Sequence, residues 1–174
     1  MIGGQVPPLN RNAAVPLYHQ LKTAILRDIE AGRWKPGDRL PTEDVAHPLE
    51  IDAGEAVFRL RRLRFADEEP LGVQTAYIAM RLVPKIDELS FAGASLYDVL
   101  ATRYALFPAA ARETHQAVAV TDPVAALLRV QPGSPAFAAE RLTSLADGRP
   151  LEYVKSIMRG DRYRIVLDLT RPAR

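Results

Sequence analysis

One turn signal occurs twice in this chain, and it constrains the fold more than any other feature. Residues 65–71 read Phe-Ala-Asp-Glu-Glu-Pro-Leu, and residues 145–151 read Leu-Ala-Asp-Gly-Arg-Pro-Leu. Each signal lies between segments in which apolar and polar residues alternate, as they do in half-buried strands. Asp147-Gly148 is a type I′ turn pair, whereas in the first copy Glu68 stands where glycine is usual. The repeat therefore predicts two β-hairpins.

The rest of this region predicts two helices and further strands. Ser95 and Asp98 are spaced as a capping box, which starts a helix that runs to about Tyr104. In chain order, we expect strands over 57–65 and 71–78, a helix over 95–104, a strand over 112–120, a helix over 121–129, a strand from 136 that leads into the second hairpin, and a last strand over 164–169. This order favours an α+β fold, in which helices cover one mostly antiparallel sheet.

An amphipathic helix is expected near the N-terminus, because four aliphatic residues repeat every fourth position. These residues are Leu17, Leu21, Ile25 and Ile29. Gly32 suits a left-handed cap at the end of this helix. Thr42 is placed to cap a second helix, which has room for barely one turn before Pro48.

The composition excludes several classes of protein. The chain has 174 residues and no cysteine, so disulfides and thiolate metal sites are excluded. No apolar run approaches the roughly 20 residues that span a bilayer, and the first fifteen residues lack the core of a signal peptide. The three histidines, His19, His47 and His115, lack metal-ligand spacing. A net charge of +2 means that any affinity for nucleic acid must come from local basic patches.

The string over 31–44, Ala-Gly-Arg-Trp-Lys-Pro-Gly-Asp-Arg-Leu-Pro-Thr-Glu-Asp, follows the first predicted helix. Together with Leu17-Tyr18 it resembles the opening of the winged helix-turn-helix domain of GntR-type bacterial transcription regulators. The resemblance covers residues 15–46 and stops before the recognition helix and the wing. Sequence-specific reading needs base contacts from such a helix. Basic side chains that could still touch DNA phosphates are Arg33, Lys35 and Arg39.

Roughly 80 residues of such a regulator would fall between Ala46 and His47, by the family layout and the usual size of a winged helix. Either the chain carries a true internal deletion, or a disordered stretch has been omitted from it. We expect the second, because a deletion that leaves both flanks intact is uncommon.

Residues 47–170 resemble a second module. The pattern Ala-Asp-x-x-Pro-Leu occurs twice, Ser-Leu-Tyr occurs at 95–97, and Arg-Gly-Asp-Arg-Tyr occurs at 159–163. This order resembles the UTRA effector-binding domain of GntR regulators of the HutC branch. UTRA domains share a fold with chorismate lyase, so the resemblance implies a chorismate lyase-like sheet. The last motif is interpreted as structural, with Gly160-Asp161 in a turn and Tyr163 anchoring the last strand.

Two arginines in the first predicted strand are candidates for anion binding. Arg62 and Arg64 are two apart, so both project from one face of the strand. Arginine suits carboxylates and phosphates because its guanidinium donates paired hydrogen bonds. A solvated polar face is the ordinary alternative, since Arg59 and Arg61 occupy the opposite parity. The UTRA resemblance implies that Arg62 and Arg64 hold the anionic end of an effector.

The same resemblance places five further residues at the effector. Gln74 stands where the family commonly has a glutamate that binds sugar hydroxyls. Ser95 would offer its hydroxyl at a helix N-terminus, although its ordinary role is the helix cap. Tyr97 would line the pocket or simply pack, and Glu152 would accept hydrogen bonds from the effector or lie exposed. Met158 replaces an aromatic residue of many relatives, so we expect an anionic metabolite without assuming a simple phosphosugar.

The two resemblances imply a cytoplasmic transcription regulator, either a repressor or an activator, that binds operator DNA as a homodimer. A small anionic metabolite, such as a phosphosugar or a carboxylic acid, would modulate operator binding, with no cofactor, metal or membrane. An alternative is a stand-alone ligand-binding module without DNA binding, which holds if the recognition helix is truly missing. An enzyme of the chorismate lyase type rests on fold alone. We expect no catalysis, because no catalytic constellation stands out.

Overall fold

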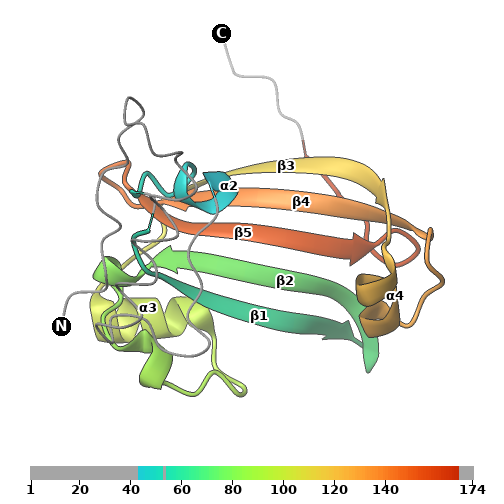
Figure 1. The fold of residues 1–174 in the computed structure, drawn as a ribbon, viewed down its shortest axis with the longest axis horizontal. Coiled ribbons are helices and arrows are strands. Elements are labelled where there is room, and N and C mark those ends of the chain that lie inside the picture. Colours follow the sequence, from blue (N-terminus) through green and yellow to red (C-terminus); the bar gives the residue numbers. More distant parts are fainter. Residues whose placement is uncertain (1–42, 53, 169–174) are drawn as a thin grey trace, which may run out of the picture. The chain divides into compact units, whose positions relative to one another are not determined.

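The computed structural model describes residues 43–52 and 54–168. Its elements, in chain order, are α2 (Glu43–Ala46), β1 (Val57–Ala66), β2 (Glu69–Ala79), the 3-10 turns η1 (Met80–Leu82) and η2 (Ile86–Glu88), α3 (Leu96–Tyr104), β3 (Ala110–Ala119), α4 (Asp122–Leu128), β4 (Pro135–Ser144) and β5 (Pro150–Arg159). The five strands form one antiparallel sheet in the order β1-β2-β5-β4-β3 (Figure 1). The expected α+β sheet and both expected hairpins are confirmed. The expected helix over residues 17–29, the caps Gly32 and Thr42, and the basic residues Arg33, Lys35 and Arg39 lie outside the described residues.

The chain divides into two compact units. The first contains Ala76–Arg112, Arg141–Tyr153 and the described residues up to Leu60. Its core includes Val45 and Leu49, which pack on Tyr153. Leu96 and Leu100 are buried and fix α3, whose cap Ser95 accepts a hydrogen bond from the Asp98 backbone N–H, as the capping box predicts.

The second unit contains Arg61–Thr75, Glu113–Glu140 and the described residues from Val154. Its core forms where α4 closes over strand residues. Val120, Ala125 and Ala136 are buried there, and Val118, Val124, Val130 and Ile157 pack against them.

The two hairpins turn in different ways. Asp67 and Glu68 have φ values of 49° and 64°, so the first hairpin has the type I′ geometry. The prediction of a type I′ pair at Asp147-Gly148 is wrong. Only Gly148 of that pair has a positive φ, and the Leu145 N–H donates to the Arg149 carbonyl, which closes a three-residue loop. Glycine is needed there as the left-handed residue that follows a type I turn.

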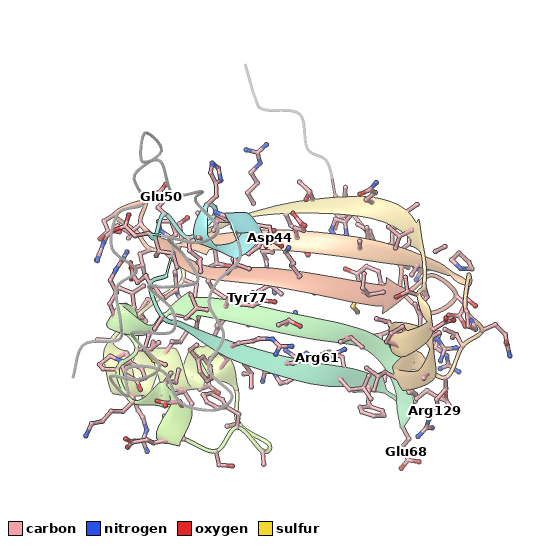
Figure 2. The ribbon with its side chains drawn as sticks, in the orientation of Figure 1. Asp44, Glu50, Arg61, Glu68, Tyr77 and Arg129 are labelled. Carbon is pink, nitrogen blue, oxygen red and sulfur yellow. The ribbon has the colours of Figure 1, made fainter. Side chains whose placement is uncertain are left out.

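We expect Glu68→Gly to stabilise the fold. Glu68 lies at the tip of the first hairpin in a left-handed conformation (Figure 2), which costs an L-residue about 1–2 kcal/mol. The added freedom of the unfolded glycine offsets part of that gain, so we expect a net increase of about 0.5–1 kcal/mol in unfolding free energy. Urea denaturation measures it. Ala146→Gly, in the other loop at negative φ, is the matched control and should lose stability, and a Glu68→Gly variant no more stable than wild type would contradict the prediction.

The last expected strand does not form. Residues 164–168 are described but belong to no strand. The β-branched Ile165 and Val166 supply a preference for extended structure, yet a strand also needs a neighbour that pairs with its backbone N–H and C=O groups. The Tyr163 ring packs on His115 and Phe137, with centroids 6.4 and 6.1 Å away, although the strand that Tyr163 was expected to anchor does not form.

Candidate functional site

The arginines of β1 divide by parity. Arg59 and Arg61 are exposed, whereas Arg62 and Arg64 are half-buried. In the second unit, the hairpin brings Gln74 of β2 beside Arg64, whose Nε and Nη2 donate to Gln74 Oε1 at 3.1 and 2.6 Å. The Gln74 carbonyl oxygen is therefore occupied, and this amide holds the Arg64 guanidinium in place.

In the first unit, α3 points a tyrosine at two buried polar side chains of β4 and β5. The Tyr97 hydroxyl donates to Glu152 Oε2 at 2.8 Å and lies 3.4 Å from Thr143 Oγ1. Glu152 is only 3% exposed, so its position in the hairpin is buried rather than on the surface. Burial raises the pKa of the Tyr97 hydroxyl, and the Glu152 carboxylate adds to that rise. We call Tyr97, Thr143 and Glu152 the Tyr97 cluster.

Arg141 lies beside the Tyr97 cluster on β4, and no sequence pattern singles it out. Its positive charge acts on Tyr97 and lowers that residue's pKa slightly against the rise caused by burial. Among the described residues, its Nε is the buried side-chain nitrogen or oxygen without a hydrogen-bond partner. A buried N–H without an acceptor costs about 1–3 kcal/mol. An acceptor supplied by a ligand would remove that cost.

Two further expected residues serve the fold. The Ser95 hydroxyl caps α3, so in this structure it accepts from the helix backbone. Met158 packs over Gly72: a Cβ at that glycine would clash with the Met158 sulfur and lie 2.9 Å from the Ile157 carbonyl oxygen. The thioether thus occupies the space that the missing side chain leaves.

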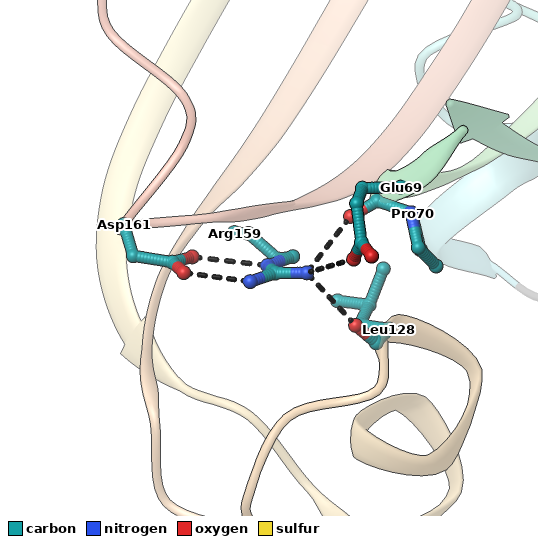
Figure 3. A network of polar contacts seen from close by, with 5 residues as sticks. All are labelled: Glu69, Pro70, Leu128, Arg159 and Asp161. Atoms are coloured by element: carbon teal, nitrogen blue, oxygen red, sulfur yellow. Dashed lines mark hydrogen bonds and ion pairs between the residues drawn. The ribbon is translucent and has the colours of Figure 1, made fainter. Parts of the chain in front are cut away.

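The motif over 159–163 builds a polar network in the second unit (Figure 3). Arg159 is 8% exposed and donates from Nε and Nη2 to the two carboxylate oxygens of Asp161, at 3.0 and 2.7 Å. Its Nη1 donates to the carbonyls of Pro70 and Leu128, at 3.2 and 3.3 Å. These hydrogen bonds lower the pKa of Asp161 and raise that of Arg159. The network supports the structural interpretation of the motif, because one guanidinium joins β2, the end of α4 and the turn after β5.

Other chemistries find little support in the described part of the chain. It contains no group of three or more histidine or acidic side chains that could hold a metal ion. No helix among these residues is both long enough and apolar enough to cross a bilayer.

Comparison with known proteins identifies the family. The UTRA domain model matches residues 36–164, so the chain belongs to the UTRA domain family. The HTH-type transcriptional repressor NagR of Bacillus subtilis is 30% identical over 152 residues, which are 83% of this chain and 62% of NagR. The HTH-type transcriptional regulator GgaR of Escherichia coli is 27% identical over 126 residues, 72% of this chain and 49% of GgaR. The chain thus spans less than two thirds of either relative.

Solved structures agree with this assignment. The effector domain of PhnF from Mycobacterium smegmatis superposes with a TM-score of 0.73 at 25% identity, over 78% of this chain and 83% of that domain. The ligand-binding domain of a GntR-family transcriptional regulator from Bordetella bronchiseptica superposes at 0.68 and 25% identity, over 75% and 85%. The relatives are transcription regulators rather than enzymes.

Proposed function

We propose that this chain is the effector-binding part of a GntR-type transcription regulator and that its effector is a small anionic metabolite. The observation that carries the proposal is its superposition on the effector and ligand-binding domains of GntR-family regulators. A phosphosugar or a carboxylic acid has the required charge. The regulator would bind operator DNA in the cytoplasm as a homodimer, because two DNA-reading heads on two half-sites require two copies.

We assign the anionic group of the effector to Arg62 and Arg64. Both guanidinium groups are half-buried, so an anion there would be partly shielded from water and bound more strongly than at the exposed Arg59 and Arg61. The hydrogen bonds that Arg64 donates to Gln74 Oε1 fix its guanidinium before the anion arrives, which lowers the entropic cost of binding.

Taken by itself, the first unit offers a set of polar groups suited to the hydroxyl groups of an effector. Glu152 is a buried acceptor, Tyr97 and Thr143 carry hydroxyls, and the Arg141 Nε lacks an acceptor among the described residues. Ser95 adds a hydroxyl at the start of α3, and Met158 in the second unit would offer an apolar contact. Binding can regulate DNA affinity only if the effector has different affinities for two states of the regulator.

The test is a thermal-shift screen of phosphosugars and small carboxylic acids with two matched double variants. A ligand at 100 times its Kd stabilises by about 2.7 kcal/mol, which is a rise of about 5–10 °C for a chain of this size. We expect Arg62→Ala with Arg64→Ala to abolish that rise, measured from the variant's own melting temperature. The control is Arg59→Ala with Arg61→Ala (Arg61 is labelled in Figure 2), which should keep it. An undiminished rise in the first variant would refute the assignment of the anion.

A further inference from the structure

The segment that follows Tyr163 exposes three large apolar side chains in a row. Ile165, Val166 and Leu167 are 37%, 69% and 75% exposed. Other exposed large apolar residues in the described chain, such as Phe65 and Leu127, stand singly, as is common on protein surfaces. Contiguous exposed apolar side chains, in contrast, are typical of surfaces that bind a partner.

The root of this segment is firmly held. The Tyr163 N–H donates to the Arg159 carbonyl at 2.9 Å, and the Tyr163 ring packs on His115 and Phe137. Beyond this point, residues up to Val166 line one side of an open hollow of about 920 Å³, with Phe137 also in its lining. The apolar side chains therefore follow a residue that is held in place, and they lie beside an open hollow.

The segment is complementary to itself in charge. It reads Arg-Ile-Val-Leu-Asp, with a cation at Arg164, an anion at Asp168 and three apolar residues between them. Two copies laid antiparallel about Val166 place each Arg164 opposite the Asp168 of the other copy. The same register places Ile165 opposite Leu167 twice, and one Val166 opposite the other.

This register also separates the side chains correctly. Alternation along a strand puts Arg164, Val166 and Asp168 on one face, and Ile165 and Leu167 on the other. Cross-strand apolar pairs and opposite charges both stabilise an antiparallel pair. A slip by one residue would move every side chain to the opposite face, so the charges at the ends define the register.

We propose that residues 164–168 of two copies of this chain pair as antiparallel strands about a two-fold axis at Val166. The contact is isologous and closes after two copies, as in most homodimers. The partner strand would supply backbone groups to a segment that belongs to no strand in the described part of the chain, so the strand that the sequence predicts would form in the dimer. This inference rests on the proposal that the regulator is a homodimer and specifies its contact.

A single thiol tests the register directly, because the chain has no cysteine. Directly opposite residues in an antiparallel pair have Cα atoms about 4.5–5.5 Å apart, within the range of a disulfide. We expect Val166→Cys to form a covalent dimer under mild oxidation about a hundredfold faster than Leu127→Cys, an exposed apolar position on α4. Equal rates of covalent dimer formation for the two variants would overturn the pairing. That result would also be expected if the segment lay against an edge of the sheet instead of against a second copy of itself.

Exchange of the two charges is an independent test. Arg164→Asp places two like charges opposite each other twice, as does Asp168→Arg, and each should weaken dimerisation by about tenfold or more. The double variant with both substitutions restores two opposite-charge pairs and should recover the wild-type dimer. Sedimentation of the full chain measures all four proteins, and a double variant as weak as either single variant would overturn the proposal.

The outcomes separate this inference from the proposed function. A wild-type dimer in which Val166→Cys does not cross-link faster than Leu127→Cys contradicts this contact and leaves the homodimer standing. A wild-type monomer contradicts both the contact and the homodimer. The effector assignment is tested by its own melting shift, which neither outcome alters.

Discussion

Replacement of Arg159 by methionine should cost about 2–4 kcal/mol of unfolding free energy, a large part of the total stability of an ordinary domain, because it leaves two backbone carbonyls without their donor. Methionine fills much of the same space but donates no hydrogen bond. The carbonyls of Pro70 and Leu128 would lose their charged donor, and the Asp161 carboxylate would lose both of its short contacts. Leu128 ends α4, where a backbone carbonyl has no partner within the helix and a cation is favourable. The expected fall in melting temperature is about 4–16 °C.

The chain contains a matched control for Arg159. Arg149 also binds an aspartate two positions away, with its Nε 2.7 Å from Asp147 Oδ2, but both side chains are at least half exposed. Exposed ion pairs contribute about 0–1 kcal/mol, so Arg149→Met should change stability little. Arg159→Lys keeps the positive charge but not the planar guanidinium. Its loss of stability should therefore lie between those of Arg159→Met and Arg149→Met. If urea denaturation shows that Arg159→Met and Arg149→Met lose similar amounts of unfolding free energy, the burial of Arg159 does not explain the contribution of its network to stability.

Those parts of the fold that depend on local sequence could be predicted. The capping box at Ser95 and Asp98 started a helix at Leu96, and both turn signals produced hairpins. A turn is specified by its own few residues, so the positions of both turns could be predicted from the sequence. The turn type at Asp147 could not, because it depends on which residues pair across the loop, and Leu145 pairs with Arg149.

Features that depend on distant residues were missed. Arg141 carries no sequence signal, since an arginine in a strand is ordinarily exposed, and its relation to the Tyr97 cluster comes from α3 and β5. The burial of Glu152 was equally unreadable, because residues on both faces of β5 are buried there. The last strand failed for the same kind of reason, because its preference is local but its pairing partner is not.

Gly160 shows the same limit and leads to the second large effect. Gly160 lies in a turn, as the sequence suggested, but its φ is not in the positive region, so the turn itself does not explain why a glycine is there. Glycine is required instead by a close approach: a Cβ at Gly160 would lie 2.7 Å from the Pro135 carbonyl oxygen, and that oxygen also accepts the Gly160 N–H at 3.0 Å. The atoms that this Cβ would meet belong to the backbone, so no side-chain rotation can relieve the clash. Gly160→Ala should therefore cost about 2–4 kcal/mol, from overpacking plus a weakened hydrogen bond.

Gly148→Ala is the control that separates the two reasons for a glycine. Gly148 has a φ of 87°, and a Cβ there would meet nothing within 4 Å, so its substitution costs only backbone strain of about 1–2 kcal/mol. We expect thermal and urea unfolding to show that Gly160→Ala is less stable than Gly148→Ala. The reverse order would mean that β4 shifts easily at Pro135, and the turn after β5 would then not be held by this contact. If Gly160→Ala is the less stable variant, Gly160 is what lets the chain pass close to β4. Arg159 fixes the same turn to the end of α4, so two neighbouring residues of one motif hold this turn.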